Sequence, residues 1–181
     1  MTVLDVATGT GLLARAAAHV LGDAGRIIGF DPSEGMLQEA RKTMRSPLVR
    51  GIAGALPFQD GRFDFLSMGY ALRHVAELEG TFLEYERVLK PGGKLLLLEI
   101  SRPGSRMALR LAKLYFGTIV PKMARIGGSR DAERLMRYYW ETIESCVAPE
   151  AVLSAMRRSG FPDATRTIVG GIFSEYAASR A

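Results

Sequence analysis

Residues 3–11 constrain the fold of this chain more than any other stretch. They begin with an apolar run that predicts a buried strand, Gly9 and Gly11 end that run, and residues 12–21 return to helical periodicity. Glycines let a backbone approach a ligand closely, and a helix N-terminus offers free N–H groups. A strand, a glycine turn and a helix in this order therefore predict an α/β nucleotide-binding fold.

The size and composition indicate one domain over residues 1–181. With 181 residues and 48% hydrophobic residues the chain can bury a core, and its apolar runs are too short to span a bilayer. The single cysteine, Cys146, excludes an internal disulfide and a cysteine-based zinc site, and the two histidines are too far apart for a local metal motif. We therefore expect a reduced, cytoplasmic protein that holds no metal.

Apolar and helical segments alternate along the chain, which predicts a doubly wound, Rossmann-like sheet of mostly parallel strands. The predicted strands are residues 2–6, 26–31, 48–53, 63–69 and 93–100, and the predicted helices are 11–21, 33–44, 77–89, 105–125, 130–145 and 148–160. Two last strands, 165–169 and 172–177, meet at a Gly-Gly pair. They predict an antiparallel hairpin at the C-terminal end.

The net charge of +5 is concentrated in residues 102–137, which hold nine Lys and Arg against two acidic residues. A basic, apolar helical segment can rest on an anionic membrane surface, or it can pack on its own domain as a lid. We favour the lid, and the membrane contact stays open as the alternative. Because no nucleic-acid motif or stacking platform accompanies the charge, we expect no nucleic-acid partner.

The acidic residues around the glycine turn distinguish two cofactors. Gly9, Gly11 and Ala14 also satisfy the dinucleotide pattern G-x-G-x-x-A, and Asp31 follows at the distance of a ribose ligand, so an NAD-binding oxidoreductase is an open alternative. Asp5 favours S-adenosylmethionine (SAM), because a phosphate loop gains nothing from a carboxylate below it. A carboxylate there could balance the sulfonium or amino group of SAM.

Other residues extend this predicted site. Asp31 ends the second predicted strand, where its carboxylate can accept both ribose hydroxyls, and Pro32 follows it. Met36, on the next helix, is placed to cover the adenine. Ala7 stands where methyltransferases often have a third glycine.

Several stretches resemble the ubiquinone/menaquinone biosynthesis C-methyltransferase family of class I SAM-dependent enzymes. They are residues 3–11, 55–64, 71–75, 86–94, 98–103, 138–143 and 169–172, and together they cover essentially the whole chain. The resemblance implies SAM contacts at Thr10, Asp31, the pair Ile52 and Ala53, and Gly69.

This sequence departs from the family pattern at two of those positions. Ile52 stands where the family usually has Asp or Asn, which accept a hydrogen bond from the adenine amino group, and Gly69 stands where it usually has Ser. One lost hydrogen bond costs on the order of 1 kcal/mol. A non-catalytic partner subunit of the same fold and a methyltransferase for another small molecule are therefore open alternatives.

The resemblance also implies the chemistry, methylation of a quinol-type aromatic ring that is first deprotonated. Arg73 is a candidate to hold the phenolate oxygen and His74 to accept the phenolic proton, unless both pair with Glu77 or Glu79. Tyr115 and Tyr138 are candidate substrate contacts in a helical lid at about residues 103–146. A homodimer and a peripheral position at the inner face of the membrane stay open.

Overall fold

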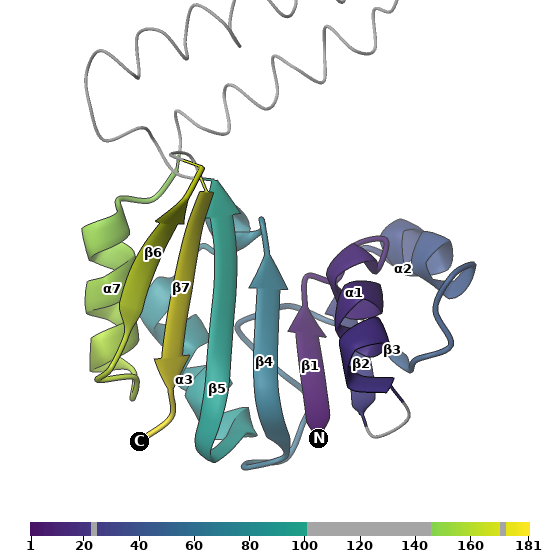
Figure 1. The fold of residues 1–181 in the computed structure, drawn as a ribbon, viewed down its shortest axis with the longest axis horizontal. Coiled ribbons are helices and arrows are strands. Elements are labelled where there is room, and N and C mark those ends of the chain that lie inside the picture. Colours follow the sequence, from purple (N-terminus) through teal and green to yellow (C-terminus); the bar gives the residue numbers. More distant parts are fainter. Residues whose placement is uncertain (23–24, 101–145, 171–172) are drawn as a thin grey trace, which may run out of the picture.

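The computed structural model describes residues 1–22, 25–100, 146–170 and 173–181. Within these ranges a seven-stranded sheet runs through the molecule in the order β3-β2-β1-β4-β5-β7-β6 (Figure 1). Its strands are β1 (Thr2–Val6), β2 (Arg26–Asp31), β3 (Leu48–Arg50), β4 (Phe63–Gly69), β5 (Leu89–Ile100), β6 (Thr165–Val169) and β7 (Phe173–Ser179). The first five strands are parallel, β7 is antiparallel to β5, and β6 is antiparallel to β7. The predicted doubly wound sheet and its C-terminal hairpin are confirmed.

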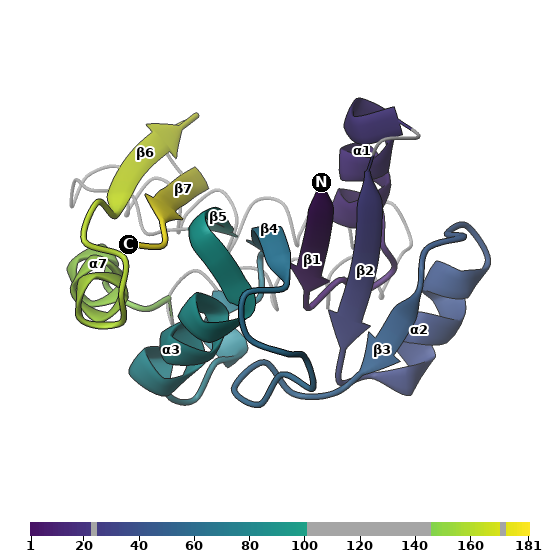
Figure 2. The same ribbon diagram turned by 90° about the horizontal axis from the view of Figure 1, so that it is seen from below.

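Helices cover both faces of this sheet. They are α1 (Leu12–Leu21), α2 (Glu34–Arg41), the short 3₁₀-helix η2 (Leu72–His74), α3 (Leu78–Val88) and α7 (Pro149–Arg158). Figure 2 shows α3 and α7 side by side on one face and α1 on the other. The helix starts follow from the sequence: Ser33 caps α2, Glu77 caps α3, and Pro149 occupies the first turn of α7.

The main core lies between the sheet and the helices α3 and α7. Alternation along the strands sends Leu4 and Val6 of β1 into this core, together with Phe82 and Met156 from the two helices. On the other face Val3 packs with residues of α1 and β2 in a second, smaller cluster. Because alternate residues of a strand lie on the same face of the sheet, Asp5 lies on the same face as Val3, which is the face covered by α1.

Three strands differ from their predicted limits, among them β7, which ends at Ser179 rather than at residue 177. β3 ends at Arg50 rather than at residue 53, and β5 begins at Leu89 rather than at residue 93. Leu89 pairs with Phe63 before the register shifts, so the Pro-Gly-Gly sequence forms an irregularity inside the strand. Gly93 is required there, because a Cβ at this position would lie 2.8 Å from the carbonyl oxygen of Lys90.

The two predicted helices at residues 105–125 and 130–145 lie outside the described residues. Among the helices that the structure does describe, none combines the length and the apolar character that crossing a membrane requires.

Candidate functional site

A cavity of about 740 Å³ opens at the carboxyl ends of the parallel strands β1, β2 and β4. Ligands of open α/β sheets bind at this edge, beside the point where the strand order reverses. The predicted cofactor residues that line the cavity are Ala7, Gly9, Asp31, Pro32, Met36, Ile52, Ala53 and Gly69. The structure thus brings residues from four separate segments to one place. Asp5, Thr10 and Gly11 are not part of the lining.

The loop after β1 turns sharply through three residues with positive φ. Ala7, Gly9 and Gly11 have φ values of 54°, 56° and 81°. A Cβ on Gly9 would meet no atom within 4 Å, whereas a Cβ on Gly11 would lie 2.0 Å from Sδ of Met44. The first glycine therefore leaves space on the cavity side, and the second allows α1 to begin close to the segment after α2.

Asp31 is the buried carboxylate of this cavity, with 6% of its surface exposed. Its Oδ2 accepts a hydrogen bond from the backbone N–H of Gly9 at 2.9 Å, and its Oδ1 accepts one from the N–H of Ser33 at 2.8 Å. Each carboxylate oxygen has a second lone pair, so the group can still accept hydrogen bonds from two ligand hydroxyls. Capping of α2 is carried out by Ser33, which leaves Asp31 available for that role.

Asp5 lies inside β1, beneath the glycine loop and outside the cavity lining. Its carboxylate is buried and accepts hydrogen bonds from the hydroxyls of Thr8 at 2.6 Å and Ser67 at 2.7 Å. Burial raises the pKa of Asp5 above its ordinary value, and the two hydroxyls oppose that rise. The side chain thus joins β1 to the glycine loop and to β4. Direct contact with a cationic cofactor stays a prediction.

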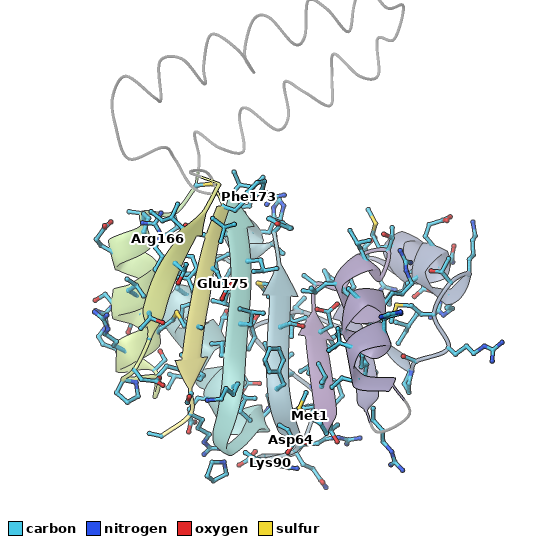
Figure 3. All side chains as sticks on the ribbon, in the orientation of Figure 1. Met1, Asp64, Lys90, Arg166, Phe173 and Glu175 are labelled. Carbon is cyan, nitrogen blue, oxygen red and sulfur yellow. The ribbon has the colours of Figure 1, made fainter. Side chains whose placement is uncertain are left out.

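The mouth of the cavity exposes apolar side chains. Met36, Ile52 and Tyr70 all line it and keep 46%, 64% and 43% of their surface exposed. Tyr70 has a φ of 56° and forms an edge-on ring contact with Phe173, with 6.1 Å between the ring centroids. Figure 3 shows Phe173 at the end of the sheet opposite to Met1.

Sequence reasoning missed Tyr70. The available signal was its position directly after Gly69, where a strand that ends at the ligand-binding edge gives way to a loop.

The two catalytic candidates separate in space. His74 is exposed and lines the cavity, whereas Arg73 does not. The guanidinium of Arg73 lies 3.2 Å from Oε1 of Glu99, with side-chain exposures of 13% and 7%, and it donates to the carbonyl of Tyr70. The backbone N–H of Arg73 donates to Oε2 of the same glutamate at 3.3 Å. Arg73 therefore joins η2 to β5 and to the loop that carries Tyr70.

The alternative prediction, that Arg73 forms an ion pair with Glu77 or Glu79, is wrong, because Arg73 pairs with Glu99. Glu77 instead accepts hydrogen bonds from the first N–H groups of α3, and Glu79 pairs with Arg158 of α7. The partner of Arg73, Glu99, lies 26 residues further along the chain.

The loop that follows the wall residues 52–54 is held by contacts with α3. Arg87 donates to the carbonyls of Leu56 at 3.0 Å and Phe58 at 2.7 Å, and its guanidinium also contacts Glu84 and Asp60. Glu84 in turn accepts the N–H of Leu56 at 2.9 Å. The Arg87 guanidinium lowers the pKa of Glu84, so this pair is charged at neutral pH. The loop beside the cavity is therefore fixed by charge-assisted hydrogen bonds.

The two tyrosines predicted to contact substrate, Tyr115 and Tyr138, lie outside the described residues, as does most of the predicted lid.

The chain is similar in sequence to one enzyme family over nearly its whole length. The model of the ubiE/COQ5 methyltransferase family matches residues 1–179. The chain is 35% identical over 171 residues to the ubiquinone/menaquinone biosynthesis C-methyltransferase UbiE of Shewanella sp. (strain ANA-3) and 34% identical over 168 residues to that of Shewanella frigidimarina. Each alignment covers 89% of this chain and 66% of the relative, so the chain spans just under two thirds of the length of these proteins.

Solved structures share the fold. A SAM-dependent methyltransferase from Aquifex aeolicus superposes with a TM-score of 0.70 at 17% identity, covering 100% of this chain and 82% of that one. A phosphoethanolamine N-methyltransferase from Haemonchus contortus, solved in complex with S-adenosyl-L-methionine, superposes with a TM-score of 0.67 at 16% identity. The superposition covers 99% of this chain and 48% of that one. These superpositions confirm the predicted Rossmann-like fold.

Proposed function

The chain belongs to the ubiE/COQ5 methyltransferase family, and from that premise we propose that it transfers the methyl group of SAM to a ring carbon of a quinol-type acceptor. The observation that carries this proposal is the cavity at the carboxyl edge of the sheet. It combines a turn with positive φ, a buried carboxylate beside that turn, and apolar side chains at the mouth. A buried carboxylate can accept hydrogen bonds from the ribose hydroxyls of a nucleoside, and apolar side chains can flank its base.

In this proposal Asp31 accepts the ribose hydroxyls while the apolar side chains of Met36 and Ile52 flank the adenine. Isoleucine cannot accept a hydrogen bond from the adenine amino group, but the backbone N–H of Ala53 can still donate to the ring. The missing acceptor weakens binding by on the order of 1 kcal/mol, or about fivefold to tenfold in Kd. The apolar contacts at the mouth partly offset this loss.

For the acceptor we propose an aromatic ring that packs against Tyr70 at the cavity mouth. His74 takes the phenolic proton, which makes the ring electron-rich. A ring carbon then attacks the methyl group, the methyl–sulfur bond breaks with its electrons on sulfur, and S-adenosylhomocysteine leaves as a neutral thioether. The methylated carbon then loses its proton to water, which restores aromaticity, and His74 returns its proton to the phenolate oxygen.

The contacts of Arg73 support a positioning role more directly than contact with the phenolate. Its guanidinium is held by Glu99 and by the carbonyl of Tyr70, so it fixes the loop that presents Tyr70 and His74 to the cavity. Because polyprenyl quinols reside in membranes, we place turnover at the cytoplasmic membrane surface.

A transfer assay with a matched histidine pair tests the proposal. The protein is incubated with SAM carrying a labelled methyl group and a polyprenyl hydroquinone, and the product is analysed by mass spectrometry. We expect label on a ring carbon and a decrease in kcat of about 100-fold or more for His74→Gln. His19→Gln, an exposed substitution on α1, serves as the control with unchanged kcat. Full activity in His74→Gln would exclude this base, and absence of labelled quinol from SAM-saturated protein would exclude the acceptor class.

A further inference from the structure

A second cavity, of about 640 Å³, lies at the edge of the sheet opposite to the cofactor site. It is formed where β1 and β2 begin and by the segments that lead into β3 and β4. Thr2 lines this cavity and Val6 lines the cofactor cavity, so the two sites lie at opposite ends of β1. Thr2 and Val6 are four residue steps apart along the strand, which is roughly 13 Å.

The lining of this second cavity is basic. Arg26, Arg45 and Arg62 come from three separate segments and all line it, and no lining residue is acidic. Among the residues that the structure describes, none forms an ion pair with these three arginines. Three uncompensated guanidinium groups around one hollow create a strongly positive potential.

A carboxylate at the same edge is already engaged. Asp64 accepts the backbone N–H of Thr2 at 2.6 Å and the ammonium of Lys90 at 2.7 Å. The ammonium of Lys90 lowers the pKa of Asp64, which stays charged and paired at neutral pH. Figure 3 shows Asp64 and Lys90 beside Met1 at this end of the sheet. Asp64 is therefore not available to neutralise the arginines.

One of the three arginines is held in place by aromatic rings. The guanidinium carbon of Arg62 lies 5.7 Å from the ring centroid of Phe58 and 5.8 Å from that of Phe63. Cation–π contact restricts the side chain without consuming its hydrogen-bond donors. The two ring contacts therefore leave the guanidinium donors of Arg62 free for an anion.

We propose that this cavity binds a small phosphate-bearing anion, with Arg26, Arg45 and Arg62 as its ligands. Guanidinium groups match phosphate oxygens in pairs, and the hydroxyl of Ser46 adds a donor at the same site. Three positive groups favour a ligand with more than one negative charge, such as a diphosphate.

A free anion fits this position better than a membrane surface. A lipid bilayer bound here would face away from the cofactor cavity, which opens at the other end of the strands. The inference does not depend on methyl transfer, because no residue of the two cavities is shared.

Calorimetric titration with inorganic pyrophosphate tests the proposal. We expect saturable binding of one equivalent to the wild-type chain and at least tenfold weaker binding to the double variant Arg45→Gln/Arg62→Gln. The control variant Arg41→Gln/Arg158→Gln loses the same charge at exposed ion pairs elsewhere and should stay within twofold of wild type. Saturating S-adenosylhomocysteine should leave pyrophosphate binding unchanged, because the cavities are separate.

The proposal would be overturned if pyrophosphate did not bind saturably, if both double variants bound it equally weakly, or if S-adenosylhomocysteine displaced it. It would also be overturned if the chain did not bind pyrophosphate but bound anionic phosphatidylglycerol vesicles in a way that depends on Arg45 and Arg62. The last result would assign the cavity to a membrane surface. Thermal unfolding of each variant verifies that it is folded at the titration temperature.

Discussion

Ala7 occupies a backbone conformation that glycine adopts at a lower energy. Its φ of 54° places an L side chain in the left-handed region, where steric contact with the backbone costs about 1–2 kcal/mol. Glycine removes that cost but gains entropy in the unfolded chain, so Ala7→Gly should stabilise the protein by about 0.5 kcal/mol. Urea unfolding measures the change.

Gly9→Ala is the reverse test. Gly9 has a φ of 56°, and a Cβ there would meet no other atom within 4 Å, so the variant should lose stability through backbone strain alone. Destabilisation by Ala7→Gly would contradict this account.

The buried carboxylate of Asp5 makes stability depend on pH. Because its pKa is raised in the folded state, the folded chain keeps this proton to higher pH than the unfolded chain does. The contribution of Asp5 to the free energy of unfolding is therefore largest below its unfolded pKa and falls as pH rises through the folded pKa. Asparagine does not titrate, and the hydroxyls of Thr8 and Ser67 can donate to it or accept from it.

We therefore expect the free energy of unfolding of Asp5→Asn to increase relative to that of wild type as the pH rises from about 4 to about 7. Parallel urea unfolding curves at several pH values measure the difference between the two proteins, which cancels the titration of all other groups. A difference that is constant over this range, or that changes in the opposite direction, would show that the pKa of Asp5 is not raised.

Residue-level prediction from the sequence succeeded where the evidence was local. Only the place of Asp31 in the cavity lining was predictable, because a strand end and a following cap residue, Ser33, are visible in one short segment. The partners of Asp5 and Arg73 were not, because Ser67 and Glu99 reach them only through pairing of distant strands. Side-chain direction along β1 also could not be assigned before the sheet order was known.

At the scale of elements, α3 holds the loop that follows one wall of the cofactor cavity. Arg87→Gln removes donors to the carbonyls of Leu56 and Phe58 and leaves Glu84 without its cation. We expect a loss of about 2 kcal/mol in the free energy of unfolding. We also expect faster amide hydrogen exchange in residues 52–60, which mass spectrometry measures. SAM binding through Ile52 and Ala53 should be weaker.

Arg41→Gln is the control, since it removes an exposed arginine of α2 that pairs only at the surface with Glu34. It should leave both hydrogen exchange and stability unchanged. If Arg87→Gln affected exchange no more than this control, the contacts with α3 would not hold the loop.

Element limits were predictable where hydrophobic runs ended at turn residues. β1, β2, β4 and β6 begin and end where their apolar or β-branched patterns do. β5 did not follow its pattern, because the pairing of Leu89 with Phe63 lies beyond a Pro-Gly-Gly segment that is typical of a turn. That pairing is a tertiary contact, which local propensity cannot reveal.

At the scale of the whole molecule, the parallel strands separate two sites of different character. Their carboxyl edge holds the cofactor cavity, with its buried carboxylate and apolar mouth, and their amino edge holds the basic cavity. A parallel sheet gives this polarity to the molecule, because all strand ends of one kind meet at the same edge. The methyl acceptor and a phosphate-bearing anion could therefore bind at the same time.

Calorimetric titration of the wild-type chain and of Asp31→Asn with S-adenosylhomocysteine tests whether the cavity at the carboxyl edge binds SAM. We expect one equivalent bound by wild type and a Kd about 10- to 100-fold weaker for Asp31→Asn, since hydrogen bonds to a charged acceptor contribute roughly 1.5–3 kcal/mol. Glu34→Gln makes the same carboxylate-to-amide change at a partly exposed position in the first turn of α2, outside the cavity lining, and it should bind within threefold of wild type. Absence of binding to wild type, or equal binding by Asp31→Asn, would contradict the assignment of this cavity to SAM.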